Sequence, residues 1–240
     1  MSTDEFVKRL QESDQRTLER RAQRLQELAQ IQTDGRLFAS QREWDYAGEA
    51  SESYINGNYR STVFCCACAV DQILRYEFLK VPGNKYEDIE KCTFGQMIGK
   101  CRRVTSLLPF LKEAETLNKL RNDIAAHPIF IDLPTSSNAD KEIRNQLVLK
   151  DINRLVDLVC LFNEEIRDQI EATKLVSEVE GKTYNFGKVI HGLEEVPFNI
   201  DGFWGLLEQD VLRFLANKSW AILKEIAEGL YGVSDSIAIA

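Results

Sequence analysis

The chain has 240 residues with 30 basic and 38 acidic side chains, a net charge of −8 and 44% apolar residues. This composition supports a buried core but excludes an extended DNA-coating surface, which would need many cations; a small local nucleic-acid site stays open. The charged start MSTDEFVKRL lacks a signal-peptide core, and no apolar run approaches the roughly 18 residues of a membrane helix, so we expect a soluble cytoplasmic protein.

A long amphipathic helix is predicted over residues 4–31. Its apolar residues recur at every third or fourth position, at Leu18, Ala22, Leu25 and Leu28. Gly35 then gives a stop signal, because glycine accepts the left-handed conformation that ends many helices. We expect a helix that is able to pair with another.

Two further helices are predicted over about 42–54 and 58–81, on either side of the turn Asn56-Gly57-Asn58. The second has an apolar stripe at helical spacing, formed by Val63, Ala67, Val70, Leu74 and Phe78. Pro82-Gly83-Asn84 ends it. We expect an antiparallel or kinked helix pair.

Three of the six cysteines lie in this second helix, in the stretch FCCACAV. Cys65 and Cys68 have C-x-x-C spacing, yet no second cysteine pair or histidine stands at the spacing of a zinc site. We therefore expect reduced cysteines that pack as small hydrophobic residues, and we assign the chain no metal and no cofactor.

The second half of the chain is predicted to be helical with irregular connections. A short helix is expected over 93–103 and a longer one over 107–126, with Pro109 in its first turn, where the missing N–H costs nothing. An apolar stripe predicts another helix over about 150–175. Residues 181–200 leave room for a short hairpin, and 203–232 has the pattern of one broken helix or two.

These elements predict an all-α fold, an antiparallel helical bundle with an N-terminal amphipathic helix and a helical C-terminal appendage. We expect three parts, at residues 1–40, 41–175 and 176–240.

The stretch LNKLRNDIAAHP contains one of only two histidines in the chain and ends at a helix-stopping proline. Together with the earlier YINGNYRSTVFCCACAVDQILRYEFLK, it resembles the HEPN family, whose members are helical bundles with an Arg-polar-His motif near the end of one helix. The resemblance covers roughly residues 42–175. The motif falls on Arg121, Asn122, Asp123 and His127.

The resemblance implies a metal-independent endoribonuclease with an active site assembled across a homodimer, as in family members that act in phage defence, toxin–antitoxin systems or RNA processing. Other members have no catalysis and act as binding or scaffold modules. Two features depart from the common pattern: the spacing from Arg121 to His127 is longer, and Pro128-Ile129 follow where one subgroup has a tyrosine.

The motif residues suit metal-free RNA cleavage, which needs a base for the 2′-hydroxyl proton, an acid for the leaving oxygen and a cation for the charged phosphorane. Histidine exchanges protons near neutral pH, and arginine offers a planar charged fork for phosphate oxygens. On an ideal α-helix Arg121 and His127 lie about 120° apart, whereas Asp123 shares a face with His127 and would orient it. Because Pro128 biases His127 away from helical conformation, two such helix ends could meet across a two-fold axis.

A structural interpretation of these residues stays open. Arg121 would then bridge a carboxylate such as Glu115 or Asp132, and His127 would donate to the last carbonyls of its helix, where the dipole favours a cation.

The segment from Lys100 to Arg121 is basic, with six Lys or Arg residues against two Glu. We expect Arg102, Arg103 and Lys119 to bind the RNA backbone, although a solvated helix face is the commoner outcome for such a run. His191 could serve as a second proton donor, but we assign it to an exposed loop. The C-terminal aromatic residues, which could stack bases but more often form a core or interface, are Phe203, Trp204, Phe214 and Trp220.

No phosphate-binding glycine loop, G-x-S-x-G or H-E-x-x-H motif occurs. We therefore predict a dimeric ribonuclease acting on single-stranded or structured RNA, in which His127 exchanges protons, Arg121 stabilises the phosphate and Asn122 positions either partner. The alternative is a non-catalytic HEPN-like scaffold that binds a partner protein through the N-terminal helix or the C-terminal appendage.

Overall fold

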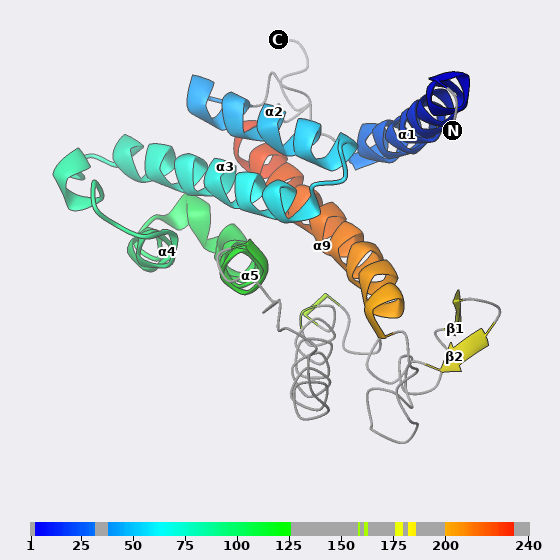
Figure 1. Ribbon diagram of the computed structural model, residues 1–240. Helices are drawn as coiled ribbons and strands as arrows, with labels where there is room; N and C mark the ends of the chain where they lie inside the picture. Colours follow the sequence, from blue (N-terminus) through cyan, green and yellow to red (C-terminus); the bar gives the residue numbers. More distant parts are fainter. Residues whose placement is uncertain are drawn as a thin grey trace, which may run out of the picture. The chain divides into compact units, whose positions relative to one another are not determined.

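The computed structural model describes residues 3–31, 38–125, 158, 161–162, 176–179, 182–185 and 200–232 (Figure 1). The fold is all-α, an antiparallel helical bundle, as the sequence predicts. The chain divides into two compact units, Met1–Arg121 with Ala216–Ala240, and Asn122–Leu215. The boundaries expected near residues 40 and 175 stay a prediction.

Helix α1 (Thr3–Ile31) has the predicted extent, and its last turns pack against the rest of the first unit. Leu28 is fully buried, whereas Leu18 and Leu25 of the predicted stripe are 58% and 52% exposed. Each residue from 11 to 23 is exposed. Within the described chain, the apolar stripe of α1 is therefore buried only at its C-terminal end.

Arg24 makes the main polar contact between α1 and the turn that follows α2 (Gln41–Ile55). Its guanidinium donates to the Tyr59 hydroxyl at 3.1 Å and to the Ile55 carbonyl at 3.0 Å. Gly57 in this turn has φ of +80°, and a Cβ there would lie 3.0 Å from the guanidinium. Glycine thus serves both the turn conformation and the close approach of Arg24.

Helices α2 and α3 (Tyr59–Lys80) run antiparallel and side by side (Figure 1). Ser40 caps α2, its hydroxyl accepting from the Glu43 N–H at 3.3 Å. The predicted apolar stripe of α3 is buried at all of its positions, Val63, Ala67, Val70, Leu74 and Phe78. The period of this stripe therefore places α3 at the centre of the first unit.

The region predicted as one helix over 107–126 contains three kinds of helix. A 3-10 helix η3 (Thr105–Phe110) leads into α5 (Leu111–Leu120), and a π-helical turn η4 (Arg121–Ala125) follows. The expectation that Pro109 begins a continuous α-helix is wrong, because Pro109 lies inside η3 and has no N–H for the α-helical bond. The predicted short helix is α4 (Phe94–Cys101), which packs with α5 against α3.

Arg75 joins α3 to the segment around η2 (Tyr86–Asp88). Its Nε donates to Asp71 at 2.9 Å, and its other guanidinium nitrogens donate to the carbonyls of Ile89, at 2.6 Å, and Cys92. One side chain therefore fixes the position of the loop that precedes α4.

A hairpin of β1 (Val176–Val179) and β2 (Lys182–Asn185) lies slightly earlier than the predicted one. Helix α9 (Ile200–Tyr231) is continuous, so the expectation of a broken helix or two is wrong. Interior glycines cost only about 1 kcal/mol each, and burial of residues such as Trp220 offsets this. The predicted helix over 150–175 lies mostly outside the described residues.

From Ala216 onward α9 belongs to the first unit. A Cβ at Gly229 would overlap the ring of Phe110, so glycine permits this close contact between α9 and η3. No helix among the described residues combines the length and apolar character needed to cross a membrane.

Candidate functional site

Arg121, the predicted phosphate-stabilising cation, lies half-buried at the end of α5 and start of η4. Its guanidinium carbon stands over the ring of Phe64 on α3, 5.6 Å from the ring centroid. Phe64 is 40% exposed, so this cation–π contact lies near the surface. The aromatic ring supports the arginine without taking away its charge.

Asp71, one turn further along α3 than Cys68, is the acidic neighbour of Arg121. Burial raises the pKa of this carboxyl group, and the Arg75 hydrogen bond and the charges of Arg75 and Arg121 lower it. Its Oδ2 accepts from Arg75, while its buried Oδ1 has no hydrogen-bond partner. The charges of both arginines thus act on this one carboxylate.

Cys65 and Cys68, on the same helix as Phe64 and Asp71, keep their protons at neutral pH. Burial raises the pKa of Cys68 to about 11 although Arg121 opposes the rise, and it raises the pKa of Cys65 to about 12. Cys65 and Cys66 are buried, which confirms the prediction that they pack as small hydrophobic residues. Thiols in this state are poor nucleophiles and poor metal ligands.

No group of three or more His, Cys, Asp or Glu side chains within the described part of the chain is arranged to hold a metal ion.

The π-helical turn η4 changes the geometry expected for the motif. An ideal α-helical angle between Arg121 and His127 does not apply, because a π-helical turn holds more residues than an α-helical one. Asn122 is exposed and Asp123 is half-buried. His127 lies outside the described residues, as does Asp132, the other carboxylate considered as a partner of Arg121.

Glu115, one of the carboxylates considered as a partner of Arg121, instead binds Arg102. The Arg102 Nη2 and Glu115 Oε1 atoms are 3.0 Å apart, with side chains 68% and 49% exposed. An ion pair this exposed contributes little to stability and opens readily. Arg102 therefore stays accessible to a solution ligand.

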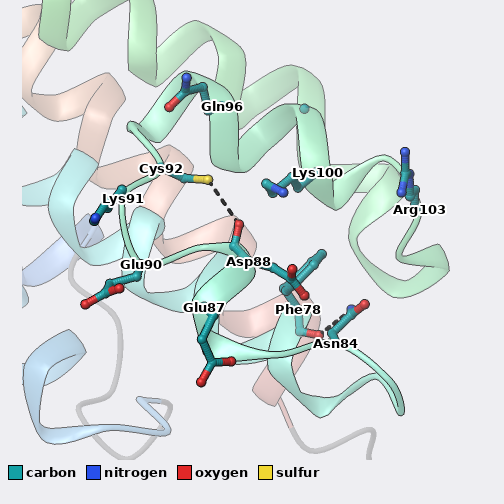
Figure 2. Close-up of a pocket in the computed structure, with 11 residues that line it drawn as sticks. Phe78, Asn84, Glu87, Asp88, Glu90, Lys91, Cys92, Gln96, Lys100 and Arg103 are labelled. Atoms are coloured by element: carbon teal, nitrogen blue, oxygen red, sulfur yellow. Dashed lines mark hydrogen bonds between the residues drawn. The ribbon is translucent and has the colours of Figure 1, made fainter.

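Arg103, the second predicted backbone-binding residue, lines an open pocket of about 770 Å³ beside η2 and α4 (Figure 2). Lys100 and Lys91 share this pocket with three acidic residues, Glu87, Asp88 and Glu90. The two signs of charge balance there. The pocket therefore does not by itself favour a polyanion, and Lys119, the third predicted residue, lies apart from it on the exposed side of α5.

Two of the predicted C-terminal aromatic residues have described side chains. Trp220 is 1% exposed and belongs to the core. Phe214 is half-buried and meets Phe162 edge-on, with centroids 6.2 Å apart. Neither is a base-stacking surface here; the side chains of Phe203 and Trp204, and all of His191, lie outside the description.

Phe64 and Asp71, which neighbour Arg121, and Arg75, which binds Asp71, were not predicted as part of the site. The four-residue spacing from Asp71 to Arg75 predicts an ion pair on one helix face. The contact between Phe64 and Arg121 joins distant parts of the chain and has no local signal.

No protein-family model, curated protein or solved structure matches this chain.

Proposed function

We propose that this chain is a metal-independent endoribonuclease that acts on single-stranded or structured RNA. The observation that carries the proposal is the position of Arg121, a half-buried cation on a π-helical turn, close in sequence to one of the two histidines. π-Helical turns are rare and occur frequently at functional sites.

Each motif residue has a chemical role in the proposal. His127 removes the proton from a 2′-hydroxyl group, whose oxygen then attacks the adjacent phosphorus, and the bond to the 5′-oxygen breaks as that oxygen takes a proton from water. Arg121 stabilises the negative charge of the phosphorane. Asn122 positions either partner, and Asp123 orients the imidazole.

The surroundings of Arg121 support this role. Phe64 restricts the guanidinium through a cation–π contact, so less conformational freedom is lost when a phosphate binds. Asp71 opposes the charge of Arg121, but it is hydrogen-bonded to Arg75 and shares its charge between two arginines. The guanidinium is thus held against an aromatic ring beside a carboxylate whose hydrogen bond goes to Arg75.

Cleavage of mixed RNA by purified protein in EDTA tests the proposal. Wild type should cut, and His127→Ala should cut at least about 100-fold more slowly, the usual scale for losing a general acid or base. His191→Ala changes the only other histidine and is the matched control, with an expected rate near that of wild type. Equal rates for all three proteins would contradict the proposal.

A second candidate is the scaffold function, which the exposure of α1 favours. Every side chain from 11 to 23 is exposed although the helix continues for several turns beyond its attachment at Arg24. A folded wild-type protein that cuts no RNA, together with loss of a defined partner after removal of residues 3–20, would favour this function instead.

A further inference from the structure

A groove separate from the Arg103 pocket lies where the start of α2, the last turns of α3 and the η2 segment meet. Its cavity volume is about 550 Å³, within the range of small-molecule sites. The side chains that carry the argument are Arg42, Asp71, Gln72, Tyr76, Leu79 and Tyr86.

Two tyrosines give this groove exposed aromatic surface. Tyr76 on α3 is 40% exposed and Tyr86 on η2 is 58% exposed, and Leu79 between them along the chain is 37% exposed. Lys80 covers part of Tyr76, at 4.5 Å from the ring centroid, but Lys80 does not line the groove. Exposed aromatic rings are the usual platforms for unpaired nucleobases.

The Arg75 contacts hold the two tyrosines in a fixed relation. Arg75 donates to the Ile89 and Cys92 carbonyls just after η2, so it ties the segment that carries Tyr86 to the helix that carries Tyr76. Asp71 in turn fixes Arg75. A groove held in this way loses little entropy when a ligand enters.

The polar residues of the groove suit the edge of a nucleobase, whereas its charges balance, with Arg42 and Arg75 against Asp71 and Glu90. The Gln72 side chain offers both donor and acceptor groups and makes no hydrogen bond within the described chain. Arg42 is exposed and forms no ion pair there either. Side chains that read unpaired bases hydrogen-bond to the base edges, which an amide such as that of Gln72 can do.

The groove also adjoins the candidate site. Asp71 lines it and is the acidic neighbour of Arg121. The groove and the surroundings of Arg121 thus share one residue, Asp71.

We infer that this groove binds an unpaired nucleobase between Tyr76 and Tyr86, which makes single-stranded RNA the substrate class; the link to cleavage rests on the proposed function. Bases in a duplex are stacked and cannot enter such a groove.

Fluorescence anisotropy with labelled single-stranded RNA decamers in EDTA tests the inference. The protein is His127→Ala, so that the RNA stays intact. Replacing both tyrosines by alanine should weaken binding by about tenfold or more, the scale of lost base stacking. The Tyr76→Phe, Tyr86→Phe protein keeps the rings and should bind almost normally, and Leu108→Ala removes an exposed apolar side chain elsewhere as a control.

An abasic decamer sharpens the test. It should bind the His127→Ala protein more weakly than the normal decamer, whereas the double-alanine protein should bind both equally. Circular dichroism and thermal unfolding must show that the variants are folded.

The outcomes separate the inference from the proposed function. Unchanged affinity in a folded double-alanine variant, equal or tighter binding of duplex RNA, or preference for an unstructured peptide would overturn the inference even if wild type cuts RNA. Loss of decamer binding in the double-alanine variant, with no cutting by wild type, would support the groove and overturn the nuclease.

Discussion

Arg75 and Arg121 share the carboxylate of Asp71 but meet it in different ways. Arg75 uses its guanidinium for hydrogen bonds to Asp71 and to the Ile89 and Cys92 carbonyls, and its side chain is 17% exposed. Arg121 lies over the exposed ring of Phe64, on a π-helical turn, and meets Asp71 through charge.

The difference separates a cation used for structure from one suited to a ligand. Hydrogen bonds to two loop carbonyls commit Arg75 to holding the η2 segment in place. Arg121, by contrast, lies against the face of Phe64, a weaker contact that is near the surface because the Phe64 ring is exposed. Substitutions at the two positions should therefore affect different properties.

The largest effect is expected on catalysis, from Arg121→Ala. Removing the group that stabilises a charged transition state typically costs about 100-fold or more in rate. Cleavage of a defined RNA in EDTA measures it. Arg121→Lys should recover only part of the rate, because an ammonium lacks the planar fork.

Arg16→Ala is the matched control, since Arg16 is an exposed arginine on α1 paired with Glu12 and lies outside the predicted RNA site. Its cleavage rate should change far less than that of Arg121→Ala. A fully active Arg121→Ala protein would remove the distinction between the two arginines.

The next effect is on stability, from Arg75→Ala. It leaves two carbonyls and a mostly buried carboxylate without their donor, at a cost of about 3 kcal/mol in the free energy of unfolding. Urea denaturation measures the loss. Arg42→Ala, an exposed change nearby, should stay within about 0.5 kcal/mol of wild type, and a similarly small loss in Arg75→Ala would contradict this structural role.

Asp71→Asn sharpens the comparison, because this residue serves both arginines. The amide oxygen can still accept from Arg75, whereas the negative charge beside Arg121 is removed. We expect RNA to bind about threefold more tightly at low salt, with the gain fading as salt rises. Anisotropy titrations at two salt concentrations check this, and weaker binding at low salt would oppose the expected charge effect.

The smallest effect concerns Glu43, a fully buried carboxyl group that lacks an arginine partner in the described chain. Burial raises its pKa above 4.5, so the folded state holds the proton more strongly than the unfolded state. Stability from this group is therefore present at low pH and lost as pH rises through the raised pKa.

Glu43→Gln should remove that loss. The variant should gain stability relative to wild type at pH 7 but not below the unfolded pKa, as measured by unfolding at both pH values. Glu43 Oε1 is also buried without a hydrogen-bond partner, which would destabilise the fold at any pH. A difference between variant and wild type that is the same at both pH values would therefore contradict the expected effect of ionisation.

The sequence predicts well those helices whose signals are local. The period of the α3 stripe and the turn around Gly57 give the helix pair with ends within a few residues of those observed. The three-part helix around Pro109 was not predictable in the same way, because 3-10 and π-helical turns depend on tertiary packing. Helix α9 continues through its glycines because buried residues such as Trp220 stabilise it.

The candidate site was predictable only in part. The motif identified Arg121, but its contact with Phe64 joins residues far apart in the chain and leaves no periodic signal. The role of Arg75 depends on two loop carbonyls, which every residue carries and no sequence pattern marks. Asp71 could be paired with Arg75 by spacing alone, yet not with Arg121.

The most direct test of the central claim is to identify the RNA ends produced in EDTA. Wild-type protein should convert one defined single-stranded RNA into fragments with 2′,3′-cyclic phosphate and 5′-hydroxyl ends, and folded His127→Ala and Arg121→Ala should make almost none. Fragments with other ends, the same products from both variants, or no cutting by a folded wild type would contradict the ribonuclease account.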